Sequence, residues 1–254
     1  MTATTIDTVE YERQGFAIVR GIFQGAVLEK LQMAADRFVG HARTVDGSAE
    51  SIRLDLLYSS FESHYEYELI NCLDSPLVLG LSELIAGGPL KANSYYINVD
   101  TPSMAWHQDS AFLPPDVPAD FDLQAFRDQT PFSQVQWNLA LVDDAVLMVV
   151  PGTHRGELTA EVQQMISDSR TRNEFVDDIP GAVRVELRGG DGVVYNNNLV
   201  HGVDNPSCTR RRTLHWFWVC RNRPDPYNFY RYVLNETHRR AISPRLLEMS
   251  QVPY

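Results

Sequence analysis

Apolar residues recur three and four residues apart in several segments before residue 90, a spacing that predicts amphipathic helices. Ser75 and Pro76 are the residue types of a helix N-cap and first turn, and Gly87 ends the same helix after Ala86. The predicted helices span residues 6–14, 24–39 and 76–86. Residues 16–20 are predicted to form a short strand.

From residue 90 the pattern changes to short runs rich in Val, Leu, Tyr and Trp, separated by Pro, Gly and Asp. The predicted strands span residues 90–98, 104–109, 134–142, 146–150, 183–188, 192–196, 199–204 and 211–220. Residues 113–133 contain four prolines and several acids and predict a loop, whereas residues 157–173 predict a helix. Helices followed by about eight strands predict a mainly β fold with an α-helical flank (α+β), arranged as a double-stranded β-helix, a jelly-roll or cupin-like barrel.

The length of 254 residues suits one large domain. We therefore expect a single domain over residues 1–254. Its expected parts are a helical N-terminal flank at about 1–89, a barrel at about 90–222 and a C-terminal extension at 223–254.

The net charge and the cysteines limit the binding partners and the cellular location that we expect for the protein. A net charge of −11 and a pI near 5.0 argue against nucleic acid or an anionic membrane as the main partner. The expected partner is a small-molecule substrate, and the expected state is a monomer or homodimer. Cys72, Cys208 and Cys220 form no disulfide pattern, and residues 1–14 have no signal-peptide core, so a cytoplasmic location is expected.

His107 and Asp109 lie in the sequence Trp-His-Gln-Asp on a predicted strand, where residues i and i+2 face the same side. An imidazole and a carboxylate can therefore reach one point, and His201 from a distant strand would complete the set. Two histidines and one carboxylate leave positions open for substrate and O₂, as is typical of non-haem Fe(II) oxygenases. The sequence thus predicts His107, Asp109 and His201 as metal ligands and as the catalytic centre.

A competing pair, His64 and Glu66, has the same spacing. It lies within residues 59–73, which have a helical pattern, so its two side chains are expected to diverge. This pair is the weaker prediction.

Three consecutive arginines follow His201, and Arg212 stands eleven residues after it. An oxygenase that uses 2-oxoglutarate needs a cation for the distal carboxylate, which Arg holds bidentately and Lys does not. Arg212 is the favoured anchor because it opens the long apolar run Leu214–Val219 of a predicted strand. Arg210 and Arg211 remain alternative anchors. The other alternative is that the three arginines only form a solvated turn and bind no co-substrate.

The alternation of this strand makes the choice testable. If Arg212 points into the barrel, then Leu214, Trp216 and Trp218 point inward as well, and His215 points outward.

The chain resembles the phytanoyl-CoA dioxygenase family of Fe(II)/2-oxoglutarate oxygenases. The matching segments are Tyr11–Phe23, Trp106–Asp109, Val149–His154, Gly190–Tyr195, His201-Gly202 and Asn205–Arg212. Each is short, but their order and spacing are specific.

The resemblance implies Fe(II), with 2-oxoglutarate and O₂ as co-substrates. It implies His107, Asp109 and His201 as iron ligands and Arg212 as the 2-oxoglutarate anchor. Asn98 matches a strand position at which the family binds this co-substrate. Gln136 and Asn138 have inward parity on their predicted strand and are further candidates, with ordinary barrel-interior polar residues as the alternative.

One segment departs from the family pattern. An Asn-Gly usually precedes the Pro-Gly-Ser-His turn, and here Asp143-Asp144-Ala145-Val146 stands there. The metal set is unaffected, but the local loop and its substrate contacts are expected to differ. His154 is predicted to be structural.

The predicted reaction is hydroxylation of an unactivated C–H of a small molecule, an amino acid or secondary-metabolite intermediate, with release of succinate and CO₂. Related halogenases have a small residue in place of the acid, whereas Asp109 is present here. Tyr96, Trp106 and Phe112 are candidate substrate contacts, with core packing as the alternative for the first two. The alternative functions are a metal-dependent cupin-type isomerase or co-substrate-free dioxygenase, and a non-catalytic ligand-binding barrel.

Overall fold

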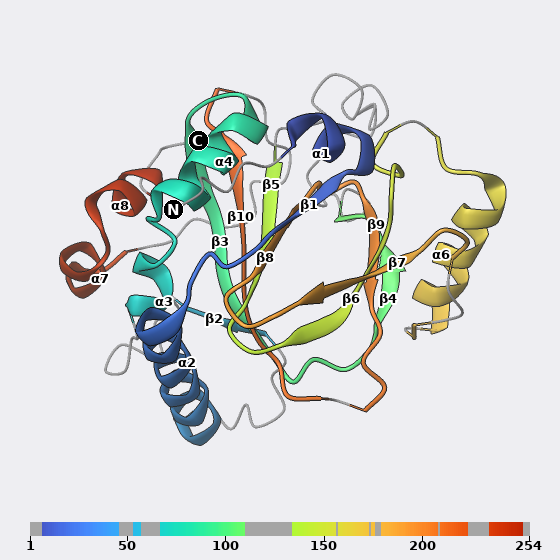
Figure 1. The fold of residues 1–254 in the computed structure, drawn as a ribbon. Helices are drawn as coiled ribbons and strands as arrows, with labels where there is room; N and C mark the ends of the chain where they lie inside the picture. Colours follow the sequence, from blue (N-terminus) through green and yellow to red (C-terminus); the bar gives the residue numbers. More distant parts are fainter. Residues whose placement is uncertain are drawn as a thin grey trace.

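Two antiparallel sheets face each other in the computed structural model (Figure 1). Residues of both sheets line a cavity. The structure describes residues 7–45, 53–56, 67–109, 134–155, 157–172, 174–175, 179–207, 209–222 and 234–250. The larger sheet has the order β1-β8-β5-β10-β3-β2, and the smaller has the order β4-β9-β6-β7. The strands are β1 (Phe16–Val19), β2 (Arg53–Asp55), β3 (Leu90–Val99), β4 (Met104–His107), β5 (Gln134–Ala140), β6 (Asp144–Val150), β7 (Val183–Leu187), β8 (Gly192–Tyr195), β9 (Val200–Val203) and β10 (Arg212–Cys220). This is the predicted double-stranded β-helix.

Helices cover the outer faces of both sheets. They are α1 (Thr8–Gln14), α2 (Gly25–Val45), α3 (Glu68–Asn71), α4 (Pro76–Ala86), α6 (Ala160–Arg172), α7 (Glu236–Ala241) and α8 (Pro244–Ser250). In Figure 1, α2, α3, α4, α7 and α8 lie beside the larger sheet, and α6 lies beside the smaller one. The helical layer and the larger sheet share one apolar core.

The ends of α4 follow the sequence signals in part. Pro76 stands in the first turn, and Gly87 has the left-handed φ of 68° that favours glycine after a helix. Ser75 occupies the N-cap position with an extended backbone, but its side chain accepts no hydrogen bond from the helix. Ser75 therefore stands at the predicted N-cap position but does not cap the helix with its side chain.

The N-terminal flank contributes strands as well as helices. β1 was expected, and it pairs with β8, with Phe16 opposite Tyr195. β2 was not expected: it pairs with β3, with Arg53 opposite Asn98. Three residues carry too little periodicity to be recognised as a strand, so the far edge of the larger sheet was missed.

The alternation of β10 is the reverse of the prediction. Trp216 and Trp218 are fully buried in the core shared with the helices, and Trp216 stacks on Trp137 with ring centroids 5.6 Å apart. Trp137 donates its Nε1–H to Ser82 of α4 at 3.0 Å, which shows that this face meets the helices. The opposite face, with His215 and Phe217, lines the cavity. The apolar side is outward because the helices cover it.

In the described part of the chain, no helix combines the length and apolar character required to cross a membrane. The predicted loop at 113–133 lies outside the described residues.

Candidate metal centre and its cavity

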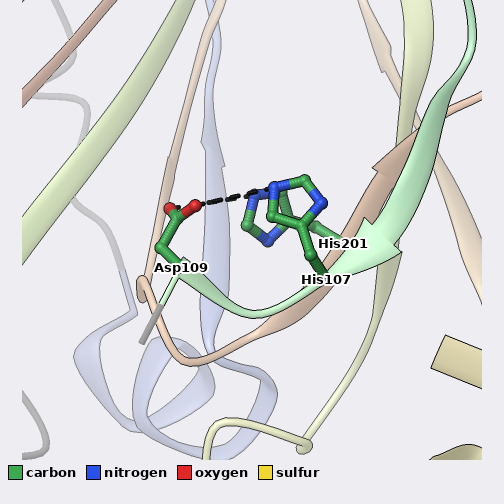
Figure 2. Close-up of side chains that lie close together, drawn as sticks. All are labelled: His107, Asp109 and His201. Atoms are coloured by element: carbon green, nitrogen blue, oxygen red, sulfur yellow. Dashed lines mark ion pairs between the residues drawn. The ribbon is translucent and has the colours of Figure 1, made fainter. Parts of the chain in front are cut away.

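His107 and His201 are directly opposite each other on β4 and β9 of the smaller sheet. Their ring centroids are 4.2 Å apart. Asp109 stands two residues past the end of β4, and its backbone N–H donates to the Asn197 carbonyl at 2.9 Å. The carboxylate meets both rings (Figure 2), with Oδ1 3.5 Å from His107 Nε2 and Oδ2 3.9 Å from His201 Nε2.

The structure thus brings together the three residues that the sequence singled out. Asp109 was expected to lie on the strand, and this expectation is wrong. β4 ends at His107, and the turn that follows aims the carboxylate.

The second nitrogen of each ring fixes its orientation. His107 Nδ1 lies 2.7 Å from the Ala105 carbonyl, and His201 Nδ1 lies 2.8 Å from the Leu199 carbonyl. A carbonyl only accepts, so both Nδ1 atoms carry the proton and both Nε2 atoms present a lone pair. The two lone pairs and the Asp109 carboxylate converge on one point.

These atoms fit a divalent metal ion. The ligand atoms lie within 4.8 Å of one another. Bonds of about 2.1 Å place neighbouring ligands roughly 3 Å apart, so small side-chain shifts would close the set. Three protein ligands also leave coordination positions open, as a catalytic metal requires.

Electrostatics keep His107 in its ligand form. Burial, with a smaller contribution from the nearby His201, lowers the pKa of His107 to about 4 against the opposing effect of Asp109. The ring is therefore neutral near pH 7, and a neutral imidazole is the form that binds metal.

A cavity of about 750 Å³ adjoins the three side chains, and residues of both sheets and of α6 line it, with the inner face of the larger sheet as one side. Polar side chains form cross-strand pairs on this face. Arg53 donates to Asn98 at 3.2 Å, Nδ1 of His215 lies 2.7 Å from Oδ1 of Asn138, and Gln136 donates to the Tyr195 hydroxyl at 2.9 Å.

The predicted co-substrate residues Asn98, Gln136 and Asn138 all line the cavity, as does the predicted substrate contact Tyr96. The sequence reasoning missed Arg53, Arg170, Tyr195 and His215 in the same wall. The polar His215 in an otherwise apolar strand was a signal for its position. Arg53 offered none.

The placement of Arg212 contradicts its prediction as a cavity residue. Its guanidinium lies on the helix side, 3.1 Å from Asp36 and 3.0 Å from Asp100, and is absent from the cavity wall. Arg210 binds both carboxylate oxygens of Asp36 at the surface.

The cavity arginine of the triple is Arg211. It precedes β10 with the parity of His215 and Phe217, which also line the cavity, and its Nε donates to Asp144 at 2.8 Å. The face that carries the tryptophans is the outer one, and this decides which arginine enters the barrel.

Trp106 is also placed differently from its prediction. It is fully buried in the cluster beneath α6, with its ring centroid 4.9 Å from that of Phe175, and it does not line the cavity. Phe112 lies outside the described residues, as do His64 and Glu66.

His154 lies away from the cavity wall. Its Nε2 is 3.0 Å from the Glu12 carbonyl, so it links the turn after β6 to α1. This contact is consistent with the structural role expected for it.

Comparisons with known proteins identify the family of the chain and solved structures that share its fold. The sequence model of the family described as phytanoyl-CoA dioxygenase (PhyH) matches residues 11–213. No curated protein matches the chain significantly.

Solved structures share the fold at low sequence identity. AviO1 from Streptomyces viridochromogenes Tue57 is 20% identical, with a TM-score of 0.59 over 85% of this chain and 95% of its own. EctD from S. alaskensis, solved with 2-oxoglutarate and 5-hydroxyectoine, is 15% identical, with a TM-score of 0.61 over 94% and 88%. SnoN, described as a non-heme alpha-ketoglutarate-dependent epimerase from nogalamycin biosynthesis, is 17% identical, with a TM-score of 0.57 over 84% and 80%. The family match covers most of the sequence, and this chain belongs to the phytanoyl-CoA dioxygenase family.

Proposed function

We propose that the protein is an Fe(II)- and 2-oxoglutarate-dependent oxygenase that hydroxylates a C–H of a small molecule. The observation that carries the proposal is the convergence of two imidazole lone pairs and the Asp109 carboxylate at a cavity that also holds a guanidinium. Family membership and the fold shared with EctD and SnoN support it.

In this proposal His107, Asp109 and His201 hold the iron. Iron bound there with 2-oxoglutarate would supply the oxidative chemistry, with O₂ consumed and succinate and CO₂ released. The contribution of the chain is to hold both groups in place and to surround them with suitable polarity. The backbone contacts at each Nδ1 atom keep the rings aimed before the metal arrives.

Arg211 replaces Arg212 as the proposed anchor for the distal carboxylate of 2-oxoglutarate. It is the member of the triple that lines the cavity, and a guanidinium holds a carboxylate through two parallel hydrogen bonds. Asn98, Gln136 and Asn138 are proposed to support the co-substrate from the same wall.

Hydroxylation is favoured because Asp109 fills the third ligand position. With a carboxylate ligand there, the coordination position that a halide would need is occupied. The cavity of about 750 Å³ is of the size that encloses a small molecule, and the polar side chains within its largely apolar wall suit a substrate that also has hydrogen-bonding groups.

Succinate formation tests the proposal without knowledge of the substrate. Purified protein is incubated with Fe(II), 2-oxoglutarate and O₂, and slow uncoupled succinate release is followed by NMR. Release that requires Fe(II), and that is lost in His107→Ala and Arg211→Gln but kept in Arg212→Gln, supports the proposal. Release unchanged in His107→Ala would overturn it.

A further inference from the structure

Arg211 is held from behind by a buried carboxylate, Asp144. Nε of Arg211 donates to Oδ2 of Asp144 at 2.8 Å, and both side chains are only 3% exposed. Within the described residues, the terminal nitrogens Nη1 and Nη2 of Arg211 make no hydrogen bond, although the residue lines the metal cavity. One edge of the guanidinium is thus bound, and its other end is available to a ligand.

Asp144 is itself fixed by its surroundings. Its Oδ2 also accepts the Thr213 hydroxyl, and its Oδ1 accepts the backbone N–H of Val146 at 3.1 Å. Burial acts to raise the pKa of Asp144, but the Arg211 charge and these hydrogen bonds outweigh it, so the pKa is lowered and the carboxylate stays ionised. An ionised group with three donors has one stable position.

Arg211 and Asp144 line different spaces. Asp144 lines a second groove, together with Asp143 and Arg184, and does not line the metal cavity. A carboxylate that enters the metal cavity therefore does not have to displace Asp144 from Arg211. The carboxylate of Asp144 and the carboxylate of the ligand would bind different edges of the Arg211 guanidinium.

We propose that Asp144 is a positioning residue, which holds Arg211 so that its terminal nitrogens grip the distal carboxylate of a 2-oxo diacid co-substrate. This inference rests on the proposed function. It assigns a task to the Asp-Asp segment, where the sequence departs from the family pattern. Without Asp144, the buried guanidinium would lose its fixed direction and its compensating charge.

Two ligands isolate the distal carboxylate. 2-Oxoglutarate and 2-oxobutanoate share the same 2-oxo acid end, and only the former has a second carboxylate. The dissociation constants of both are measured anaerobically by calorimetry on Fe(II)-loaded protein. Their ratio reports how strongly the protein binds the distal carboxylate alone. A general loss of structure weakens both ligands and leaves no selective change in the ratio.

The variants are Asp144→Ala and Asp144→Asn, with Asp143→Asn as the matched control. Asp143 is the adjacent, exposed carboxylate, and it binds the Gly189 backbone instead of an arginine. Fe(II) affinity and thermal unfolding are measured for each variant. Asp144→Asn keeps the side-chain volume and one acceptor, so it provides a folded variant if Asp144→Ala does not fold.

We expect the wild-type protein and Asp143→Asn to prefer 2-oxoglutarate strongly. The preference should fall on the order of tenfold in Asp144→Ala, and less in Asp144→Asn, with Fe(II) affinity unchanged. A ratio in both Asp144 variants equal to that of Asp143→Asn would overturn the positioning role and leave the proposed function standing. A wild-type protein that binds Fe(II) but shows no preference for 2-oxoglutarate would overturn the proposed function itself.

Discussion

Arg211 and Arg212 are adjacent in the chain, yet their side chains bind carboxylates on opposite sides of the larger sheet. Arg211 lines the metal cavity and binds Asp144, while Arg212 binds Asp36 and Asp100 beneath the helices. The difference follows from strand alternation, which sends successive side chains to opposite faces. Two substitutions of the same kind should therefore have different consequences.

Arg211→Gln should weaken 2-oxoglutarate binding by at least about tenfold, because a charged bidentate contact is lost. Arg212→Gln should leave that affinity near the wild-type value and lower the free energy of unfolding by about 1–3 kcal/mol, because two carboxylates lose a charged donor. Calorimetry and urea unfolding separate the effects. Equal losses of 2-oxoglutarate affinity in both variants would contradict the assignment.

The two faces of β10 should also differ in stability. Trp216→Ala removes a fully buried ring from the core under the helices and should cost about 3–5 kcal/mol in unfolding free energy. Phe217→Ala, at the partly exposed cavity wall, should cost clearly less. Urea denaturation of the two variants measures both, and a larger loss for Phe217→Ala would reverse the proposed orientation of the strand.

His154 should make stability depend on pH in metal-free protein. Burial lowers the pKa of His154 to about 4, whereas an unfolded histidine titrates near about 6.5. Between these values the unfolded chain binds a proton that the folded chain does not, so stability is lost as the pH falls below about 6.5. One such group contributes up to about 1.4 kcal/mol per pH unit.

The matched variant is His154→Gln, which keeps a polar side chain and removes the titration. Unfolding free energies at pH 7 and pH 5 should differ more in the wild-type protein than in this variant, since other groups act in both. An equal or larger pH effect in His154→Gln would show that His154 is not held neutral.

The sequence was sufficient to single out the three candidate metal ligands that the structure brings together, and to place most of the strands, because both depend on local signals. A His-x-Asp pair next to a turn and a second histidine on a later strand are visible in the residues themselves. The alternation of Gln136 and Asn138 with apolar neighbours likewise placed them in the wall of the cavity.

The predictions that failed concern side chains whose position depends on tertiary packing. Alternation in β10 showed which residues share a face, but the face that enters the barrel depends on the helices that cover the other. Trp106 was misplaced for the same reason, since α6 covers its side of β4. Arg53 was missed because a three-residue edge strand has no pattern of its own and is defined by its pairing with β3.

The most direct test of the account is an anaerobic titration of the metal-free protein with Fe(II), followed by 2-oxoglutarate. We predict tight binding of a single Fe(II), lost in His107→Ala and His201→Ala. Addition of 2-oxoglutarate should then produce a visible charge-transfer band, which 2-oxobutanoate produces only at much higher concentration. Fe(II) binding that persists in both histidine variants, or that yields no band with 2-oxoglutarate, would contradict the central claim that these three residues form an Fe(II)/2-oxoglutarate centre.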